Sequence, residues 1–381
     1  MTRMAAQGRW LKRLALIALG LLVTVLILEI GVRVWVTYAG DERQRLLYLY
    51  SRDDISRLAT RFQGVAYLNY GLSPRYPQSN SLGYRGPEIA IPKPPGVFRI
   101  VALGGSSTYG EFIAEWQDAY PAQLERILRD DYGYARVEVV NAGIPGYTSW
   151  ELTVNFMFRV LDLDPDLIII YEAINDINPR LSAPEFYNGL NTGHGFWREL
   201  DDPLPPSALY RFLAVRLFDW QPTVAYGLDR QFVQPEGYRD CGLVIQGGKP
   251  LCANLGMTAE EVLRANPPVY FERNIRHIVI LAQAEDIQVL LSSWAYSPAV
   301  FDRPGGDFLS YEFRQAAVAE HNVILRAIAD EFQVPMYDLA ASMPQDRQYW
   351  VDGMHVNPRG AREQARQYAA FMVEAGLLPA Q

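Results

Sequence analysis

The segment Arg99-Ile-Val-Ala-Leu-Gly-Gly-Ser-Ser-Thr-Tyr-Gly110 predicts how the rest of the chain folds. Its aliphatic run, Ile100 to Leu103, is typical of a buried central strand, which Gly104 and Gly105 then interrupt. Ser106 follows where a strand gives way to a helix, at the carboxyl end of a parallel sheet, and open α/β sheets bind their ligands there. Backbone N–H groups around such a turn are able to stabilise an oxyanion. A turn rich in Gly and Ser is a weak signal alone, so its meaning depends on the rest of the chain.

Beyond this segment, predicted strands and helices alternate. We expect further strands at 137–140, 167–171, 288–293 and 334–337, and helices at 119–129, 150–161, 269–284, 311–332 and 358–375. The run Leu167–Tyr171 is continuous and rich in β-branched residues, as in a strand buried on both faces. This alternation predicts an α/β fold in which helices wrap a five-stranded parallel sheet.

Length and composition set limits on the fold and on the partners. The 381 residues suffice for one large α/β domain with an additional segment, and 49% hydrophobic with 20% charged residues is typical of a globular protein. The net charge of −8 argues against a nucleic-acid partner, because binding phosphates needs a basic surface.

The N-terminus carries a predicted membrane segment. Leu14 to Leu28 is free of charge, and basic residues precede it, which keeps the N-terminus cytoplasmic and sends the following chain across the membrane. Glu29 and Arg33 lie one helical turn apart and are able to pair, so the helix can continue beyond the charge-free run. We expect residues 1–39 to be an uncleaved signal anchor. A cleaved signal peptide is the alternative, although no clear Ala-x-Ala site follows. In either case the remaining chain is exported, to the periplasm or the exterior.

The exported chain divides into three predicted parts. Residues 40–97 form a juxtamembrane segment, helical over 41–62 and then rich in loops, and residues 98–381 form the main domain. Residues 179–268 interrupt this domain as a Pro-, Gly- and aromatic-rich insertion without a strong period, able to form a lid or a substrate wall. Cys241 and Cys252 lie within it, at a spacing that suits a disulfide if the compartment is oxidising, whereas two free thiols are the alternative.

A possible acid–base pair stands just before the last predicted helix, in Trp350-Val-Asp-Gly-Met-His-Val-Asn-Pro-Arg-Gly360. Asp352 and His355, three residues apart on a loop, can fold so that the carboxylate meets Nδ1 of the imidazole. The other ring nitrogen then faces outward as a general base, which a serine needs to become a nucleophile. Taken singly, Asp352 is better interpreted as a helix cap and His355 as a residue of a surface loop.

Four motifs fall at carboxyl ends of predicted strands or in the loops beyond them, so one sheet edge could gather them. They are Gly104-Gly-Ser-Ser-Thr108, Asn141-Ala-Gly-Ile-Pro-Gly146, Ala173-Ile-Asn-Asp176 and Asp352-Gly-Met-His355. With them the chain resembles the SGNH hydrolases, also called the GDSL esterase and lipase family. The resemblance covers residues 99–381, apart from the segment 179–268.

This resemblance implies a three-layer, flavodoxin-like α/β/α fold and a site without a cofactor. Ser106 would be the nucleophile, and Asp352 and His355 would complete a catalytic triad. The backbone N–H groups of Ser106 and Gly146 and the side-chain amide of Asn175 would form the oxyanion hole.

Two departures from the family pattern affect the predicted site. Gly105 stands where the Gly-Asp-Ser motif has aspartate, which removes a supporting carboxylate. Ala173 and Ile174 replace glycines before Asn175, and their side chains would narrow the site and favour a small acyl chain.

Other candidate residues carry less weight. Ser107 is an alternative nucleophile on motif alignment. The remaining histidines, His194, His277 and His321, look ordinary, and no His-x-His or Glu-x-x-His spacing indicates a metal. The Gly104–Gly110 turn lacks the lysine of a phosphate-binding loop. Aromatic residues near strand ends could stack on sugar rings, although such residues more often belong to the core: Tyr109, Trp116, Tyr147, Trp150, Trp294 and Tyr296.

The sequence therefore predicts a membrane-anchored, exported serine esterase that removes a small acyl group, such as acetyl, from a carbohydrate or cell-envelope substrate. Its partners would be an acyl ester or acylated glycan and, through the N-terminal helix, a lipid bilayer. Two alternatives remain open: an O-acyltransferase that uses the same serine, and a non-catalytic envelope scaffold.

Overall fold

The computed structural model describes residues 2–40, 42–49, 61–187, 189, 196–197, 206–217, 232–233, 243–246, 249–252, 255–300 and 311–380. Contacts divide the chain into two compact units, residues 1–61 with 198–231 and residues 62–197 with 232–381. We expected domain boundaries after residues 39 and 97, whereas the two units are divided after residues 61, 197 and 231. Part of the expected insertion, residues 206–217, belongs to the first unit.

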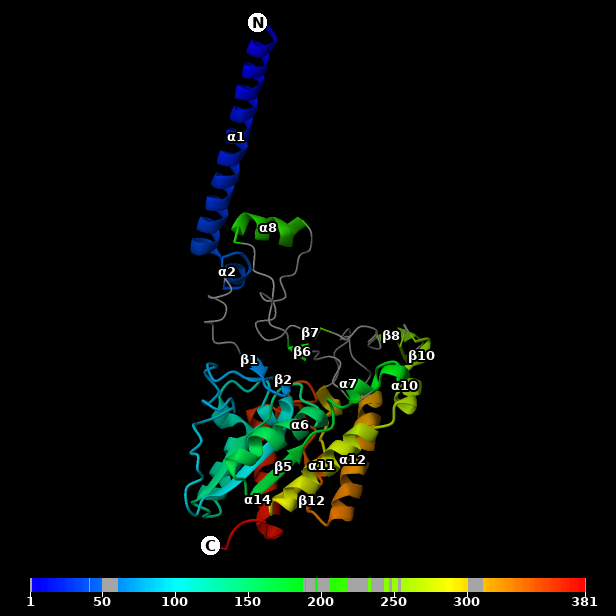
Figure 1. Ribbon diagram of the computed structural model, residues 1–381. Coiled ribbons are helices and arrows are strands. Elements are labelled where there is room, and N and C mark those ends of the chain that lie inside the picture. The colour runs from blue at the N-terminus through cyan, green and yellow to red at the C-terminus, as the bar shows by residue number, and fades with distance from the viewer. Residues whose placement is uncertain are drawn as a thin grey trace. The chain divides into compact units, whose positions relative to one another are not determined.

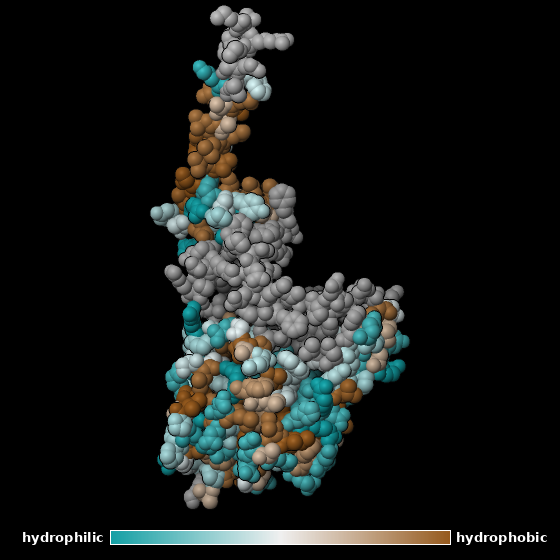
Figure 2. All heavy atoms as spheres, viewed as in Figure 1, coloured by the Kyte–Doolittle hydropathy of each residue, from teal (hydrophilic) through white to brown (hydrophobic). Residues whose placement is uncertain are grey.

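The first unit contains the N-terminal apolar helix α1 (Thr2–Ala39) and the shorter helices α2 (Glu42–Tyr48) and α8 (Ala208–Leu217). Residues Lys12–Ala39 of α1 are long and apolar enough to cross a membrane, with a mean hydropathy of 2.6, and Figure 2 shows this apolar surface uncovered. Val36, Leu47 and Tyr48 form a small buried cluster against which Phe212 packs. The predicted helix over 41–62 is confirmed only at 42–48, and it is wrong at its end, because Phe62 begins a strand.

A five-stranded parallel sheet forms the centre of the second unit, as predicted. Its strands, in spatial order, are β12 (Met336–Tyr337), β11 (Gln288–Ser292), β5 (Leu167–Tyr171), β3 (Phe98–Gly104) and β4 (Val137–Asn141). In the register Ile100 pairs with Val139 of β4 and with Leu167 of β5. All residues of β5 are buried, which explains its continuous apolar sequence.

Two groups of helices cover the sheet and make it a three-layer α/β/α domain. The chain moves from β3 outward to β4 through α5 (Tyr120–Asp130) and then back across β3 to β5 through α6 (Ser149–Asn155). Because such crossovers are right-handed, this reversal places α5 and α6 on opposite faces. Helices α11 (Val269–Ala284) and α12 (Tyr311–Phe332) lie on the α6 side, whereas α14 (Pro358–Glu374) packs against α5 (Figure 1).

The bounds of the long helices around the sheet agree with the predicted ones, except at the end of α6. The predicted helix over 150–161 ends early, since a π-helical turn (Phe156–Val160) and a 3₁₀ turn (Leu161–Leu163) follow Asn155. Pro358 occupies the first turn of α14, behind the N-cap Asn357, where its missing N–H leaves no hydrogen bond unmade.

Smaller elements surround the sheet. The additional strands form the hairpin of β1 (Phe62–Val65) and β2 (Leu68–Leu72), the pair β6 (Phe196–Trp197) and β7 (Phe232–Val233), and the antiparallel set β8 (Leu243–Gln246), β9 (Lys249–Cys252) and β10 (Met257–Thr258). The short helices are α4 (Ser106–Tyr109), α7 (Ile177–Arg180), α10 (Ala259–Ala265) and α13 (Leu339–Ser342). Further 3₁₀ turns lie at Trp116–Asp118, Pro184–Phe186, Pro298–Val300 and Arg347–Tyr349.

The expected insertion therefore contains regular structure, and α10 contributes Val262 to the main core. The predicted disulfide lies outside the described residues, because they exclude Cys241 and the side chain of Cys252.

Candidate active site

Ser106 stands at the carboxyl edge of the sheet, as its motif predicts. It is the first residue of α4, two residues after the end of β3. The turn is tight: a Cβ on Gly104 would lie 2.1 Å from Thr108 Oγ1 and 2.4 Å from the carbonyl oxygen of Tyr171. Only glycine fits there, so the strand turns directly into the short helix that carries Ser106.

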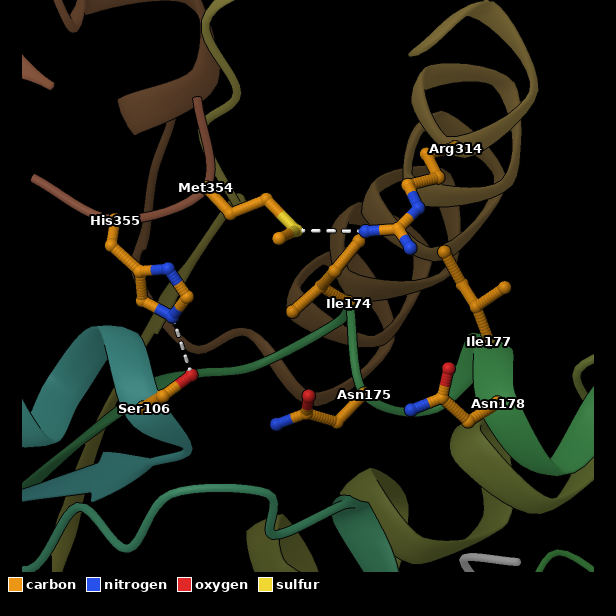
Figure 3. A pocket seen from close by; sticks show the side chains of 8 residues that line it. All are labelled: Ser106, Ile174, Asn175, Ile177, Asn178, Arg314, Met354 and His355. Carbon is orange, nitrogen blue, oxygen red and sulfur yellow. Dashed lines mark hydrogen bonds between the residues drawn. The ribbon is translucent and has the colours of Figure 1, made fainter. Parts of the chain in front are cut away.

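Three of the predicted site residues form a continuous hydrogen-bonded chain. Nε2 of His355 lies 2.7 Å from Oγ of Ser106, and Nδ1 of His355 lies 2.9 Å from Oδ2 of Asp352 (Figure 3 shows the first contact). Oδ1 of Asp352 also accepts the backbone N–H groups of Met354 and His355, each at 2.9 Å. The loop before α14 therefore fixes the carboxylate and the imidazole in one orientation.

The Asp352 carboxylate determines which ring nitrogen of His355 carries the proton. Burial raises the pKa of Asp352, but the hydrogen bonds from His355 and from the backbone outweigh this and hold the pKa below its ordinary value. An ionised Asp352 accepts a hydrogen bond from Nδ1–H of His355, and this tautomer leaves the Nε2 lone pair directed at the serine hydroxyl. This is the arrangement in which a serine becomes a nucleophile.

The neighbouring serine is engaged elsewhere. Ser107 is buried, and its hydroxyl donates to the carbonyl oxygen of Met354 at 3.2 Å. Ser106 is thus the residue of the pair whose hydroxyl meets His355.

Asn175 and Gly146 come from the turns after β5 and β4. The Asn175 side chain lines the same pocket as Ser106, and its Nδ2 donates to the carbonyl oxygen of Tyr147 at 2.8 Å. Gly146, with a φ of 83°, directly precedes Tyr147, so the two turns adjoin. Gly146 itself is not one of the described residues that line the pocket.

The carboxyl group of Glu172 lies beside Gly105, the position at which the family motif has an aspartate. Its Oε1 accepts the N–H groups of Ala173 and Asn175, at 3.0 and 3.2 Å, and the carboxylate also accepts the N–H of Gly105. A Cβ on Gly105 would lie 2.6 Å from Oε2 of Glu172. Glu172 thus links the turn before Ser106 to the turn that carries Asn175, a role that sequence reasoning missed.

Glu172 and Asp176 are buried carboxyl groups behind the site. Burial, followed by the nearby Asp176, raises the pKa of Glu172 well above its ordinary value. Burial also raises the pKa of Asp176 to about 7, although the hydroxyl and N–H of Ser149, at 2.5 and 2.8 Å, oppose the shift. These groups favour their protonated forms at a pH where exposed carboxyl groups are ionised.

His321 is buried and has a structural role, whereas we expected it to be an ordinary histidine. Its Nε2 faces Nη1 of Arg180 at 3.2 Å and must accept, since arginine only donates. Its Nδ1–H therefore donates to the carbonyl oxygen of Ala173 at 2.8 Å. Burial, followed by the charge of Arg180, lowers the pKa of His321 to about 3, so this ring stays neutral.

The pocket beside Ser106 has a cavity volume of about 130 Å³. The described residues that line it are Ser106, Ile174, Asn175, Ile177, Asn178, Arg314, Met354 and His355 (Figure 3). Ile174 lines the pocket, whereas Ala173 is buried and is not among its described lining residues.

One aromatic side chain lies against the imidazole, and it is not among those that the sequence indicated. Phe112 is 62% exposed, and its ring meets the His355 ring edge-on at 5.3 Å. Its φ of 67° is unusual for a bulky residue. The six aromatic residues near strand ends do not line the pocket, and Tyr109, Tyr147, Trp294 and Tyr296 belong to the core.

The remaining histidines add no second site within the described structure. His277 is exposed on α11, and His194 lies outside the described residues. Over those same parts of the chain, no group of three metal-ligating side chains occurs.

Comparison with known proteins identifies the family. Residues 102–363 match the GDSL-like lipase/acylhydrolase family, which covers more than half of the chain. The chain therefore belongs to this family, and it is a hydrolase of the SGNH/GDSL type, as the sequence motifs predict. No curated protein matches the sequence significantly.

Several solved structures are similar to this chain. A lipase/acylhydrolase from Enterococcus faecalis is 17% identical, covers 75% of this chain and 100% of its own, and gives a TM-score of 0.42. An acetyl xylan esterase is 15% identical over 72% of this chain and 99% of its own, with a TM-score of 0.39. A GDSL-like lipase from Bacteroides thetaiotaomicron is 15% identical over 74% of this chain and 89% of its own, with a TM-score of 0.37.

Proposed function

We propose that the protein is a membrane-anchored, exported serine esterase that removes a small acyl group from a carbohydrate or another cell-envelope substrate. The observation that supports this most directly is the chain of contacts from Asp352 through His355 to Ser106. In a hydrolase of this family, that chain supplies a nucleophile, a base and the group that orients the base.

In the first half of the reaction, Ser106 Oγ attacks the ester carbonyl carbon while Nε2 of His355 takes the hydroxyl proton. Asp352 stabilises the imidazolium that forms, because its ionised carboxylate stays hydrogen-bonded to Nδ1. His355 then gives the proton to the departing alcohol, and the acyl group remains on Ser106.

The negative charge that develops on the carbonyl oxygen needs hydrogen-bond donors. We assign this role to the N–H groups of Ser106 and Gly146 and to the Asn175 amide. Each such donor typically contributes about 3 kcal/mol to transition-state stabilisation. Glu172 would keep these donors in place, since it binds the N–H groups of Gly105 and Asn175.

In the second half, water takes the place of the alcohol. His355 removes a proton from the water, the hydroxide attacks the acyl carbon, and Ser106 leaves with the proton from His355. A cavity of about 130 Å³, narrowed by Ile174, suits a small acyl group such as acetyl. Phe112 is exposed beside His355 and offers an aromatic face to a sugar ring of the alcohol part.

The N-terminal sequence supports the proposed location. The basic residues before Leu14 favour a cytoplasmic N-terminus, and α1 is long enough to span a bilayer. The catalytic unit would then lie on the outer side of that membrane.

Active-site labelling tests the proposed nucleophile. The full chain in detergent is treated with a fluorophosphonate, which phosphonylates activated serines, and the labelled peptide is identified by mass spectrometry. We expect the label on Ser106, and we expect Asp352→Asn to slow labelling, because the imidazole then loses its orienting carboxylate. Labelling of another serine, or none in the folded protein, would contradict the assignment.

A further inference from the structure

The acidic residue of the N-terminal apolar helix holds the first turn of another helix in the same unit. Glu29 of α1 accepts the Ser207 hydroxyl at 2.8 Å and the N–H groups of Ala208 and Leu209 at 3.0 and 2.8 Å. The first N–H groups of a helix have no partner within it, so this carboxylate acts as the N-cap of α8. The helix dipole also stabilises a negative charge at that end. The cap therefore comes from a residue about 180 positions earlier in the sequence.

Arginine side chains complete the surroundings of this carboxylate. Arg33 donates from Nε to Glu29 and from Nη2 to the carbonyl oxygen of Pro206, both at 2.7 Å. It therefore bonds to α1 and to the residue just before Ser207 at the same time. Arg211, which is buried on α8, lies within electrostatic reach of Glu29 as well. Groups from both helices thus satisfy one carboxylate.

Apolar packing extends the contact beyond the cap. The ring of Phe212 on α8 meets Trp35 of α1 edge-on at 6.0 Å and lies 5.6 Å from the ring of Tyr48 on α2. Ala208 and Ala214 of α8 are buried, and small side chains allow helices to approach each other closely. Helix α8 is thus held to α1 by the polar cap and by the aromatic contact.

The depth of the cap follows from the proposed membrane span, on which this inference rests. About 20 residues cross the hydrocarbon core of a bilayer, and counted from Leu14 they end at Arg33. Glu29 then lies one helical turn, about 6 Å, inside that end. An ionisable residue at such a depth needs a partner within the protein, because lipid chains offer no hydrogen bonds. The first turn of α8 provides it.

Helix α8 lies in a part of the chain that leaves the second unit and returns to it. The strands β6 and β7 pair with each other in the second unit, and α8 lies between them in the sequence. Along the chain, α1 is joined to the second unit through residues 40–61. The contact between α1 and α8 therefore joins them by a second path, which does not pass through those residues.

We propose that α8 is a second attachment of the catalytic unit to its membrane anchor, made by docking on residues 29–36 of α1. The docked partner is a segment of this same chain. The contact keeps the catalytic unit at the bilayer after a cut between α1 and Phe62, which would otherwise release it. It also requires that α1 is retained, since cleavage after residue 39 would remove the cap that Glu29 provides.

Cleavage between the two attachments tests this proposal. A recognition site for a sequence-specific protease is inserted after Ile55, and the full chain is reconstituted in phosphatidylcholine nanodiscs. Size-exclusion chromatography after cleavage measures how much of the C-terminal fragment stays with the nanodiscs. Wild type is compared with Glu29→Ala, Glu29→Gln and the control Thr24→Ala. Thr24 also lies on α1, and its hydroxyl donates within that helix to the carbonyl oxygen of Gly20 at 2.9 Å.

We expect most of the fragment from wild type and from Thr24→Ala to elute with the nanodiscs. Glu29→Ala should raise the ratio of released to bound fragment about 10- to 100-fold, as expected for a lost charged hydrogen bond. Glu29→Gln keeps an acceptor oxygen and should release an intermediate amount. Release of the wild-type fragment, or equal retention of the Glu29→Ala fragment, would overturn the inference.

Hydrogen exchange of the chain without the inserted site gives a second readout. The amides of Ala208 and Leu209 should exchange slowly in wild type and faster in Glu29→Ala, and equal rates would also overturn the inference. The uncut chain tests the anchor separately: if it does not elute with the nanodiscs, the proposed anchor fails and the second attachment with it. Hydrolysis of 4-nitrophenyl acetate that depends on Ser106 would show that the proposed esterase activity stands even where the attachment fails.

Discussion

Replacement of Gly105 by aspartate restores the Gly-Asp-Ser motif of the family, and here it should inactivate the enzyme. A Cβ at this position would lie 2.4 Å from Nδ2 of Asn175 and 2.6 Å from Oε2 of Glu172, whereas ordinary contacts begin at 3.4 Å. Neither neighbour can withdraw freely, because Asn175 Nδ2 donates to Tyr147 and Glu172 accepts the backbone N–H of Asn175. The new carboxylate would also lie beside a buried carboxyl group.

The geometry sets the size of the effect. To accept the Cβ, the Asn175 amide must move by about 1 Å (3.4 minus 2.4 Å), which removes it from its position as an oxyanion donor. Loss of one such donor lowers kcat by about 10²- to 10³-fold. Overpacking of a buried site costs about 1–3 kcal/mol of stability, so Tm should fall by several degrees.

The assay measures kcat on 4-nitrophenyl acetate and thermal unfolding for Gly105→Ala, Gly105→Asp and the double variant Gly105→Asp/Glu172→Gly. The alanine variant contains the steric clash without the charge and should show the same direction of change. The double variant moves the carboxylate from Glu172 to the other turn and should recover part of kcat and Tm. A Gly105→Asp enzyme with wild-type kcat and Tm would refute the reasoning.

Three further variants and one mass measurement test other parts of the structure. Because burial raises the pKa of Asp176 to about 7 from an ordinary 3.8, its protonated form stabilises the fold at low pH, and this contribution, about 4 kcal/mol at most, is lost as the pH rises through 7. Asp176→Asn should therefore flatten the fall in unfolding free energy between pH 5 and 8 in denaturant titrations; an unchanged slope would contradict this. Phe112→Gly should raise the free energy of unfolding by about 1 kcal/mol, and Tm with it, because the left-handed strain is relieved, while KM for acylated glycans increases; a lower Tm would argue against strain. Asp352→Asn should lower kcat about 10⁴-fold with little change in Tm, and near-normal turnover would exclude its orienting role. The intact mass of the purified membrane protein should include Glu29, whereas a mass that begins after residue 39 would identify a cleaved leader.

The sheet and its helices were predictable because each element carries a local signal. The continuous run Leu167–Tyr171 is buried on all sides, and Pro358 marks the first turn of α14. The early end of α6 was not predictable in this way, since residues 156–160 keep helical spacing but adopt a π turn. Phe62 was assigned to the end of the arginine-rich stretch that we expected to be helical, whereas it begins a strand and pairs with Leu72.

The residues of the site also divide into those that the sequence indicates and those that it does not. Ser106, Asn175, Asp352 and His355 lie in short motifs whose spacing already fits their chemistry. Glu172, Arg314, Phe112 and His321 act through contacts across the fold, and their own neighbours in the sequence do not indicate those contacts. Glu172 came nearest to being predictable, because it directly follows a buried strand, where an acidic residue needs partners. Arg314 lines the same pocket as Ser106 because α12 packs beside the turn after β5, and no spacing in the sequence indicates this arrangement.

Hydrolysis of 4-nitrophenyl acetate by the full chain, with Ser106→Ala beside Ser107→Ala, tests the catalytic role of Ser106 most directly. The two serines are adjacent, but one hydroxyl meets Nε2 of His355 and the other donates to the carbonyl oxygen of Met354. We predict that Ser106→Ala abolishes turnover while it unfolds at the wild-type temperature, and that Ser107→Ala retains most of the activity. Turnover that survives in Ser106→Ala would contradict the assignment of Ser106 as the nucleophile.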